Sequence, residues 1–75
     1  MKFTFLTENQ IDILAEEAVT NYEVSASWNA AAYAALQYSR DEWGFNPYGT
    51  AIKLVIKRAE LIWQAETIRV KAVIA

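Results

Sequence analysis

The residues of this chain that could take part in chemistry are carboxylates, lysines, arginines and tyrosines, because the sequence contains neither histidine nor cysteine. Histidine is the most common general base, and cysteine supplies the thiol nucleophile and most structural zinc sites. Carboxylate pairs such as Asp12 with Glu16 fall on helix faces that we expect to be solvated. A catalytic pair needs a cleft that separates its two pKa values. We therefore predict a protein that is not an enzyme and needs no metal or cofactor.

Side chains suited to protein recognition gather in two places. Tyr33, Gln37 and Arg40 recur at steps of four and three, which places them together on one helix face. An aromatic ring beside an arginine is a pair enriched in binding hot spots. Phe45 and Tyr48 follow in a corner segment. These five residues are the predicted partner-binding site; the alternative is a surface tyrosine whose ring the stem of Arg40 covers.

The length and composition predict one domain, residues 1–75, that assembles with other copies. A chain this short buries only about 60% of the surface that its unfolded form exposes. Hydrophobic residues make up 55% of the sequence, above the usual share of about 45–50%. Because no disulfide or metal can reinforce the core, a second chain is the remaining source of stability.

The apolar residues do not form a membrane span or an export signal. No run approaches the roughly 18 apolar residues of a transmembrane helix, and the first residues, MKFTF, lack the long apolar region of a signal peptide. We therefore expect a cytoplasmic protein, in a bacterial or host cell, that does not bind membranes.

The net charge of −2 lacks the basic excess with which nucleic-acid binding proteins neutralise phosphates. The charge is unevenly distributed. Residues 1–39 hold one lysine and five carboxylates, whereas residues 40–75 hold six basic and four acidic side chains. This asymmetry predicts attraction between the two halves, within one chain or between chains.

The first helix is predicted at 7–24. Thr7 and Gln10 match the Thr-x-x-Gln capping box, in which each side chain accepts a hydrogen bond from a free backbone N–H, and an apolar face follows at steps of three and four. The helix also carries a row of carboxylates that is either a solvated face or a docking strip for a basic partner: Asp12, Glu16 and Glu23.

The second helix is predicted at 26–43, after a serine cap at Ser25 or Ser27. Its apolar face is rich in small residues, which let a neighbouring helix approach closely. The face consists of Trp28, Ala32, Ala35, Leu36, Ser39 and Trp43, with Ala31 and Tyr38 at its edge.

Gly44 is placed to end the second helix in a left-handed conformation. Next, we favour a tight turn over 46–49 with Thr50 as the cap of the third helix; alternatively, Asn46 is the cap and Pro47 lies in the first turn.

The third helix, at 50–74, carries two apolar stripes. The larger one consists of Ile52, Val55, Ile56, Ala59, Ile62, Trp63, Val70, Val73 and Ile74. The second stripe lies nearly opposite, and Leu54, Leu61 and Ile68 recur in it at heptad spacing. A helix that is apolar on two sides must be covered on two sides. We therefore predict a central third helix, and an oligomer interface formed by Leu54, Leu61, Ala65 and Ile68.

A competing fold is α+β. Residues 2–6 and 67–74 alternate between polar and apolar types, and they could pair as a two-stranded ribbon. Such a ribbon is only marginally stable by itself, so we favour the all-α fold with three helices.

Together these features predict a helical oligomer that acts by stoichiometric protein–protein binding. Its size and composition are compatible with accessory inhibitors of the phage-encoded type. Two alternatives stay open. One is a binder of a small, nucleotide-like anion between protomers, using Trp43, Tyr48, Arg58 and Arg69. The other is nucleic-acid binding or mimicry, which the net charge disfavours.

Overall fold

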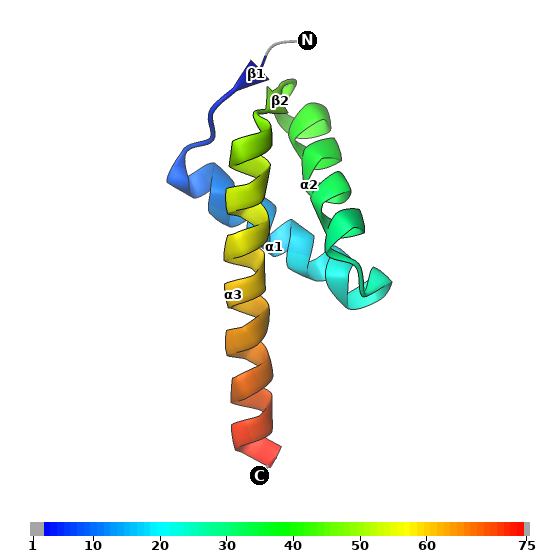
Figure 1. Ribbon diagram of the computed structural model, residues 1–75, viewed down its shortest axis with the longest axis vertical. Helices are drawn as coiled ribbons and strands as arrows, with labels where there is room; N and C mark the ends of the chain where they lie inside the picture. Colours follow the sequence, from blue (N-terminus) through cyan, green and yellow to red (C-terminus); the bar gives the residue numbers. More distant parts are fainter. Residues whose placement is uncertain (1–2, 75) are drawn as a thin grey trace.

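Three helices make up most of the chain. The computed structural model describes residues 3–74, with side chains described from Phe5 to Ile68. Helix α1 spans Glu8–Ser25, α2 spans Trp28–Trp43 and α3 spans Gly49–Ile74. The predicted all-α, three-helix domain is therefore confirmed (Figure 1).

The chain termini do not form the alternative ribbon. Residues 67–74 continue α3, and the N-terminal segment pairs elsewhere: strand β1 (Phe3–Thr4) lies parallel to β2 (Asn46–Pro47), with Phe3 opposite Asn46. The ribbon prediction was wrong because no glycine or proline interrupts the helical register of α3 after Gly49. The short pairing holds Phe3 and Thr4 close to the start of α3 (Figure 1).

The predicted caps of α1 and α2 are largely confirmed. The backbone N–H of Thr7 donates to the Gln10 side chain at 3.0 Å, and the N–H of Gln10 donates to the Thr7 hydroxyl at 3.2 Å. Of the two candidate serines, Ser27 caps α2, since its hydroxyl accepts from the N–H of Ala30. Gly44 ends α2 at a φ of 71°, a conformation that glycine adopts without strain.

The start of α3 differs from both predicted versions. Residues 46 and 47 are extended, and α3 begins at Gly49. The carbonyl of Tyr48 accepts hydrogen bonds from the N–H groups of Ala51 and Ile52. The pairing of β2 with β1 accounts for the difference, because it holds Asn46 and Pro47 straight where a local turn was predicted.

Helix α1, rather than α3, is the helix on which the other two pack. It contacts both α2 and α3 extensively, whereas α2 and α3 pack against each other much less. The physical reason is the width of its apolar face, which is fully covered on both flanks. The buried residues of that face are Ile11, Leu14, Ala15, Ala18 and Val19.

Small residues set the spacing of the helices. Ala31 and Ala35 of α2 and Ala59 of α3 are completely buried against α1, beside Val55. Because alanine has so short a side chain, the helix backbones approach closely at these points. The alanine-rich contact face predicted for α2 is thus confirmed in part: Ala35 and Ser39 are buried as predicted, whereas Ala31, predicted at the edge of the face, is also completely buried and Ala32 is only half-buried.

The molecule is elongated, measuring 48 by 23 by 18 Å. Its length comes from α3, whose C-terminal part continues past α1 and α2 (Figure 1). Consequently, a large part of the surface of α3 has no other helix beside it.

Candidate functional site

The side of α3 that faces away from the core is a row of exposed hydrophobic residues. Leu54, Leu61 and Ile68 expose 54%, 60% and 67% of their surface, and Ala65 beside them is also exposed. We call these four residues the outward stripe. On the opposite side of the same helix, Val55 and Ala59 are completely buried. The two-stripe pattern of the sequence is therefore confirmed as far as Ile68, since the side chains of Val70, Val73 and Ile74 lie outside the described residues, while assembly through the outward stripe stays a prediction.

A shallow groove runs beside the outward stripe, where α3 meets the first turn of α1. It has a volume of about 220 Å³. Its apolar lining comes from Ile11, Leu54 and Leu61, and charged side chains stand at its margins. We call it the α1–α3 groove; its charged residues are Glu8, Lys57 and Arg58.

Arg58 joins α3 to α1 at this groove. Its guanidinium donates to the carboxylate of Glu8 at 3.1 Å and also to that of Asp12. The hydrogen bond to Glu8, followed by the charge of Asp12, raises the pKa of Arg58 above its already high ordinary value. Two side chains of α1 therefore already engage this arginine, which limits its use for a foreign anion. Of the row of carboxylates predicted on α1, Asp12 therefore forms an ion pair within the chain.

The predicted binding face of α2 is only partly available. Tyr33 exposes 67% of its surface. Gln37 is exposed and donates to the carboxylate of Asp41 at 3.2 Å. Arg40 is half-buried, and its Nε donates to the side chain of Asn46. Arg40 therefore helps to hold the corner between α2 and α3, and Tyr33 is the most accessible member of the set.

The aromatic residues of the corner separate into two groups. Phe45 is half-buried and stacks on Trp43, with ring centroids 5.8 Å apart. Tyr48 lies against Phe5, with centroids 4.6 Å apart, and these two rings are 41% and 72% exposed. Phe45 thus contributes to local packing, while Tyr48 belongs to an accessible aromatic pair.

Sequence reasoning did not include Phe5 in the site. The polar–apolar alternation of the first residues indicated an extended segment, but nothing local to that segment placed it beside Tyr48. The contact depends on the pairing of β1 with β2.

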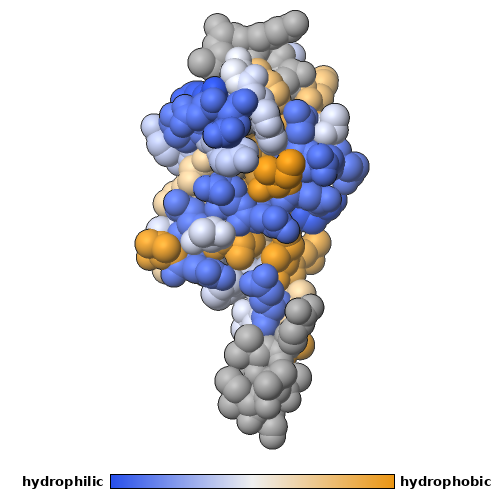
Figure 2. Space-filling model, turned by 180° about the vertical axis from the view of Figure 1, so that it is seen from behind, coloured by the Kyte–Doolittle hydropathy of each residue, from blue (hydrophilic) through white to orange (hydrophobic). Residues whose placement is uncertain are grey.

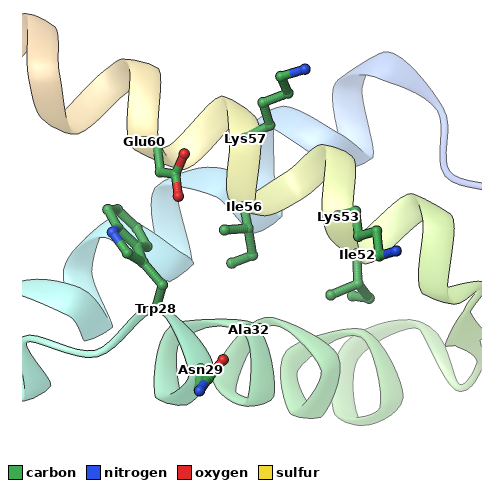
Figure 3. A pocket seen from close by; sticks show the side chains of 8 residues that line it. All are labelled: Trp28, Asn29, Ala32, Ile52, Lys53, Ile56, Lys57 and Glu60. Atoms are coloured by element: carbon green, nitrogen blue, oxygen red, sulfur yellow. The ribbon is translucent and has the colours of Figure 1, made fainter.

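A second, larger groove lies between α2 and α3, with a volume of about 440 Å³. Figure 3 shows Ile52 and Ile56 pointing from α3 toward α2, Trp28 closing one end beside Glu60, and Lys57 pointing away. The groove exists because α2 and α3 pack weakly against each other. Its complete lining is Trp28, Asn29, Ala32, Ile52, Lys53, Ile56, Lys57 and Glu60.

Trp28 is a fixed wall of this second groove. Its ring stacks on that of Tyr22, with centroids 3.9 Å apart, and Tyr22 in turn meets the edge of Trp63. A ring held in this way can receive an apolar or planar group without losing much freedom of its own. The sequence analysis did not predict this groove, because it placed Trp28 and Ala32 in a helix–helix contact that leaves no space between the helices.

The residues proposed for an anion site between protomers have separate contacts within one chain, as far as they are described. Trp43 packs against Tyr38 and Phe45, and Arg58 is paired with α1. The side chain of Arg69 lies outside the described residues.

Other kinds of site find no support in the described part of the chain. In it, no cluster of three or more acidic, histidine or cysteine side chains could hold a metal ion. Of residues 3–74, none belongs to a helix with the length and apolar character of a membrane span. On the face seen in Figure 2 the surface is mainly hydrophilic, with hydrophobic residues in separate patches.

Comparison of the chain with known protein families, with curated proteins and with solved structures found no match. A proposal for its function therefore depends on its own surfaces.

Proposed function

We propose that this chain is a protein-binding module that acts without turnover and assembles with further copies of itself through the outward stripe of α3. The observation that carries the proposal is the exposure of Leu54, Leu61 and Ile68 by more than half, at heptad spacing, on a helix whose other side is core. Burying the exposed part of one such side chain contributes about 1–2 kcal/mol, and three of them contribute together. For a domain this small, that is a large share of the total stability.

The heptad spacing is what distinguishes this surface from scattered exposed residues. Single exposed hydrophobic residues are common on soluble proteins. Three of them at intervals of seven form a straight seam along a helix, which is the pattern that a second helix covers. Val24, by contrast, is 88% exposed and lies alone near the end of α1.

The test compares Leu61→Glu with Val24→Glu. Both substitutions place a carboxylate at an exposed apolar position, so both variants should keep their helical circular dichroism. Light scattering after size-exclusion chromatography should show an assembled wild type, an assembled Val24→Glu variant and a monomeric Leu61→Glu variant. A wild type that is monomeric at high concentration, or a Leu61→Glu variant that stays assembled, would refute the proposal.

For the contact with a different protein we propose the accessible aromatic residues, Tyr33 on α2 and Tyr48 with Phe5 at the corner. Aromatic anchors of this kind dominate the binding energy of many interfaces. Once a partner is captured, Tyr33→Ala and Tyr48→Ala should each weaken its binding by more than about 1 kcal/mol, whereas Val24→Ala should not. Losses below that value in both tyrosine variants would remove these residues from the site.

A small anionic ligand is the second candidate, and the α2–α3 groove is the observation that favours it. Its volume of about 440 Å³ lies within the range of roughly 300–1,000 Å³ that is common for ligand sites. Trp28 offers a ring for stacking, and Lys53 offers a positive charge at the margin. Nucleoside mono- and triphosphates should then raise the thermal denaturation midpoint, with a smaller rise in a Lys53→Gln variant. No rise with any nucleotide would end this candidate.

A further inference from the structure

The α1–α3 groove is a shallow apolar depression that one side chain of another molecule could fill. Ile11, Leu54 and Leu61 give it an apolar lining, and Ile11 is otherwise almost fully buried, with only 7% of its surface exposed. The first turn of α1 forms one wall and α3 forms the other. A single branched apolar side chain, entering from outside, would complete the packing around Leu54 and Leu61.

The outward stripe also offers such a side chain. Ile68 is 67% exposed and lies near the C-terminal end of α3, which ends at Ile74. The C-terminal part of α3 continues beyond α1 and α2 (Figure 1). Ile68 lies 14 residues from Leu54, or about 21 Å along the helix. Within one chain, therefore, Ile68 cannot reach the groove beside Leu54.

We propose that two copies of the chain pair through antiparallel α3 helices, with Ile68 of each copy seated in the α1–α3 groove of the other. This inference rests on the proposed function, because it names the occupant of the outward stripe and its orientation. The stripe is symmetric about Leu61, so an antiparallel pairing centred there brings Ile68 opposite Leu54 at both ends. A parallel, in-register pairing would instead place each Ile68 opposite the Ile68 of its partner, about 21 Å along the helix from Leu54.

The arrangement closes at two copies. Each chain supplies one projecting Ile68 and one groove, and a two-fold axis satisfies both at once. In such a pair the Ile68 side chain and the α1–α3 groove of both copies are occupied, so the expected assembly is a dimer.

Cysteine cross-linking tests the orientation, because the natural chain has no cysteine that could interfere. A disulfide requires Cβ atoms within roughly 3.5–4.5 Å. Leu54→Cys and Ile68→Cys chains, distinguished by tags of different mass, are unfolded together, refolded and oxidised. The antiparallel pair predicts a mixed disulfide as the main product. Each variant oxidised by itself should cross-link no more than a Val24→Cys control, whose position is exposed and off the stripe.

The outcomes separate this inference from the proposed function. If light scattering finds only monomer, the proposed function and the inference both fail. If the protein is dimeric but Leu54→Cys cross-links with itself, or if the mixed disulfide does not exceed the control, the antiparallel pairing alone is overturned.

A second measurement does not depend on disulfide geometry. Ile68→Ala should raise the dissociation constant of the dimer about a hundredfold, or about tenfold for each of the two grooves, because both side chains that fill the grooves are lost. Ile13→Ala, at an exposed position on α1, should leave it unchanged. Equal dimer affinities for Ile68→Ala and the wild type would remove Ile68 from the interface.

Discussion

The two sides of α3 are both apolar, yet the protein uses them in opposite ways. On the core side, Val55 and Ala59 are completely buried; on the outer side, Leu54 and Leu61 are more than half exposed. The core side mixes alanine with branched residues, which lets α1 approach closely. The outer side has large residues at intervals of seven, a pattern suited to the wider spacing of a paired helix. Similar hydrophobicity on two sides of one helix can therefore indicate two different partners.

The strongest contrast is expected between neighbouring residues of α3. Val55→Ala removes two methyl groups from a fully buried site and should lower the free energy of unfolding by about 2–3 kcal/mol. Leu54→Ala should change it by less than about 0.5 kcal/mol in the monomer, because this side chain is exposed. Urea denaturation at low protein concentration measures both. Similar losses in the two variants would show that the sides do not differ as described.

The two alanines of α3 provide the converse experiment. Ala59→Leu inserts volume into a closed contact and should cost about 1–3 kcal/mol of stability. Ala65→Leu adds the same atoms to the outward stripe and should leave the stability of the monomer unchanged. Thermal denaturation of the dilute proteins compares them, and an unaffected Ala59→Leu variant would contradict close packing of α3 against α1.

Assembly should make stability depend on concentration. If the outward stripe is covered by a second copy, the denaturation midpoint of the wild type should rise by about 3–5 °C for each tenfold increase in protein concentration. A Leu54→Ala, Leu61→Ala double variant should show no such rise, since it keeps the core but loses the interface. A midpoint that is independent of concentration in both proteins would count against assembly.

The smallest effect is expected at the boundary between the two sides, where Arg58 reaches Glu8 and Asp12. These groups are largely exposed, so Arg58→Gln should lower the denaturation midpoint only slightly, and the difference should vanish in about 1 M NaCl. The pKa of Arg58 is raised, so its contribution is complete at neutral pH and is lost only as the pH rises through that high value. A salt-independent difference would instead point to lost packing of the arginine stem.

Much of the fold could be predicted because its signals are local. The capping box at Thr7 and Gln10, the glycine at 44 and the spacing of apolar residues each act within a few positions. The helix bounds that these signals gave differ from the observed ones by only one or two residues. The existence of an exposed second stripe on α3 followed from the same periodicity.

What the sequence could not give are contacts between distant segments. The pairing of β1 with β2 spans two residues on each side, too few to leave a recognisable pattern. With this pairing in place, α3 begins at Gly49, Thr50 lies inside the helix and is not its cap, and the ring of Phe5 packs against that of Tyr48. Likewise, nothing local to Arg58 indicates that it pairs with α1.

For the candidate site, the sequence indicated which residues are exposed more reliably than it indicated which of them lie together. Tyr33, Gln37 and Tyr48 are exposed as expected, but Arg40 and Phe45 also help to hold the corner. The α2–α3 groove arises from weak packing between those two helices. A helical wheel shows which side of a helix is apolar, and it does not show how closely a neighbour covers that side.

The central claim is that a second copy covers the outward stripe of α3. Sedimentation equilibrium of the wild-type protein, followed from low to high concentration, tests it most directly. The proposed pairing predicts a mass that rises from that of one chain, 8.5 kDa, to twice that value and then stays constant. A mass that remains at 8.5 kDa at every concentration would contradict it.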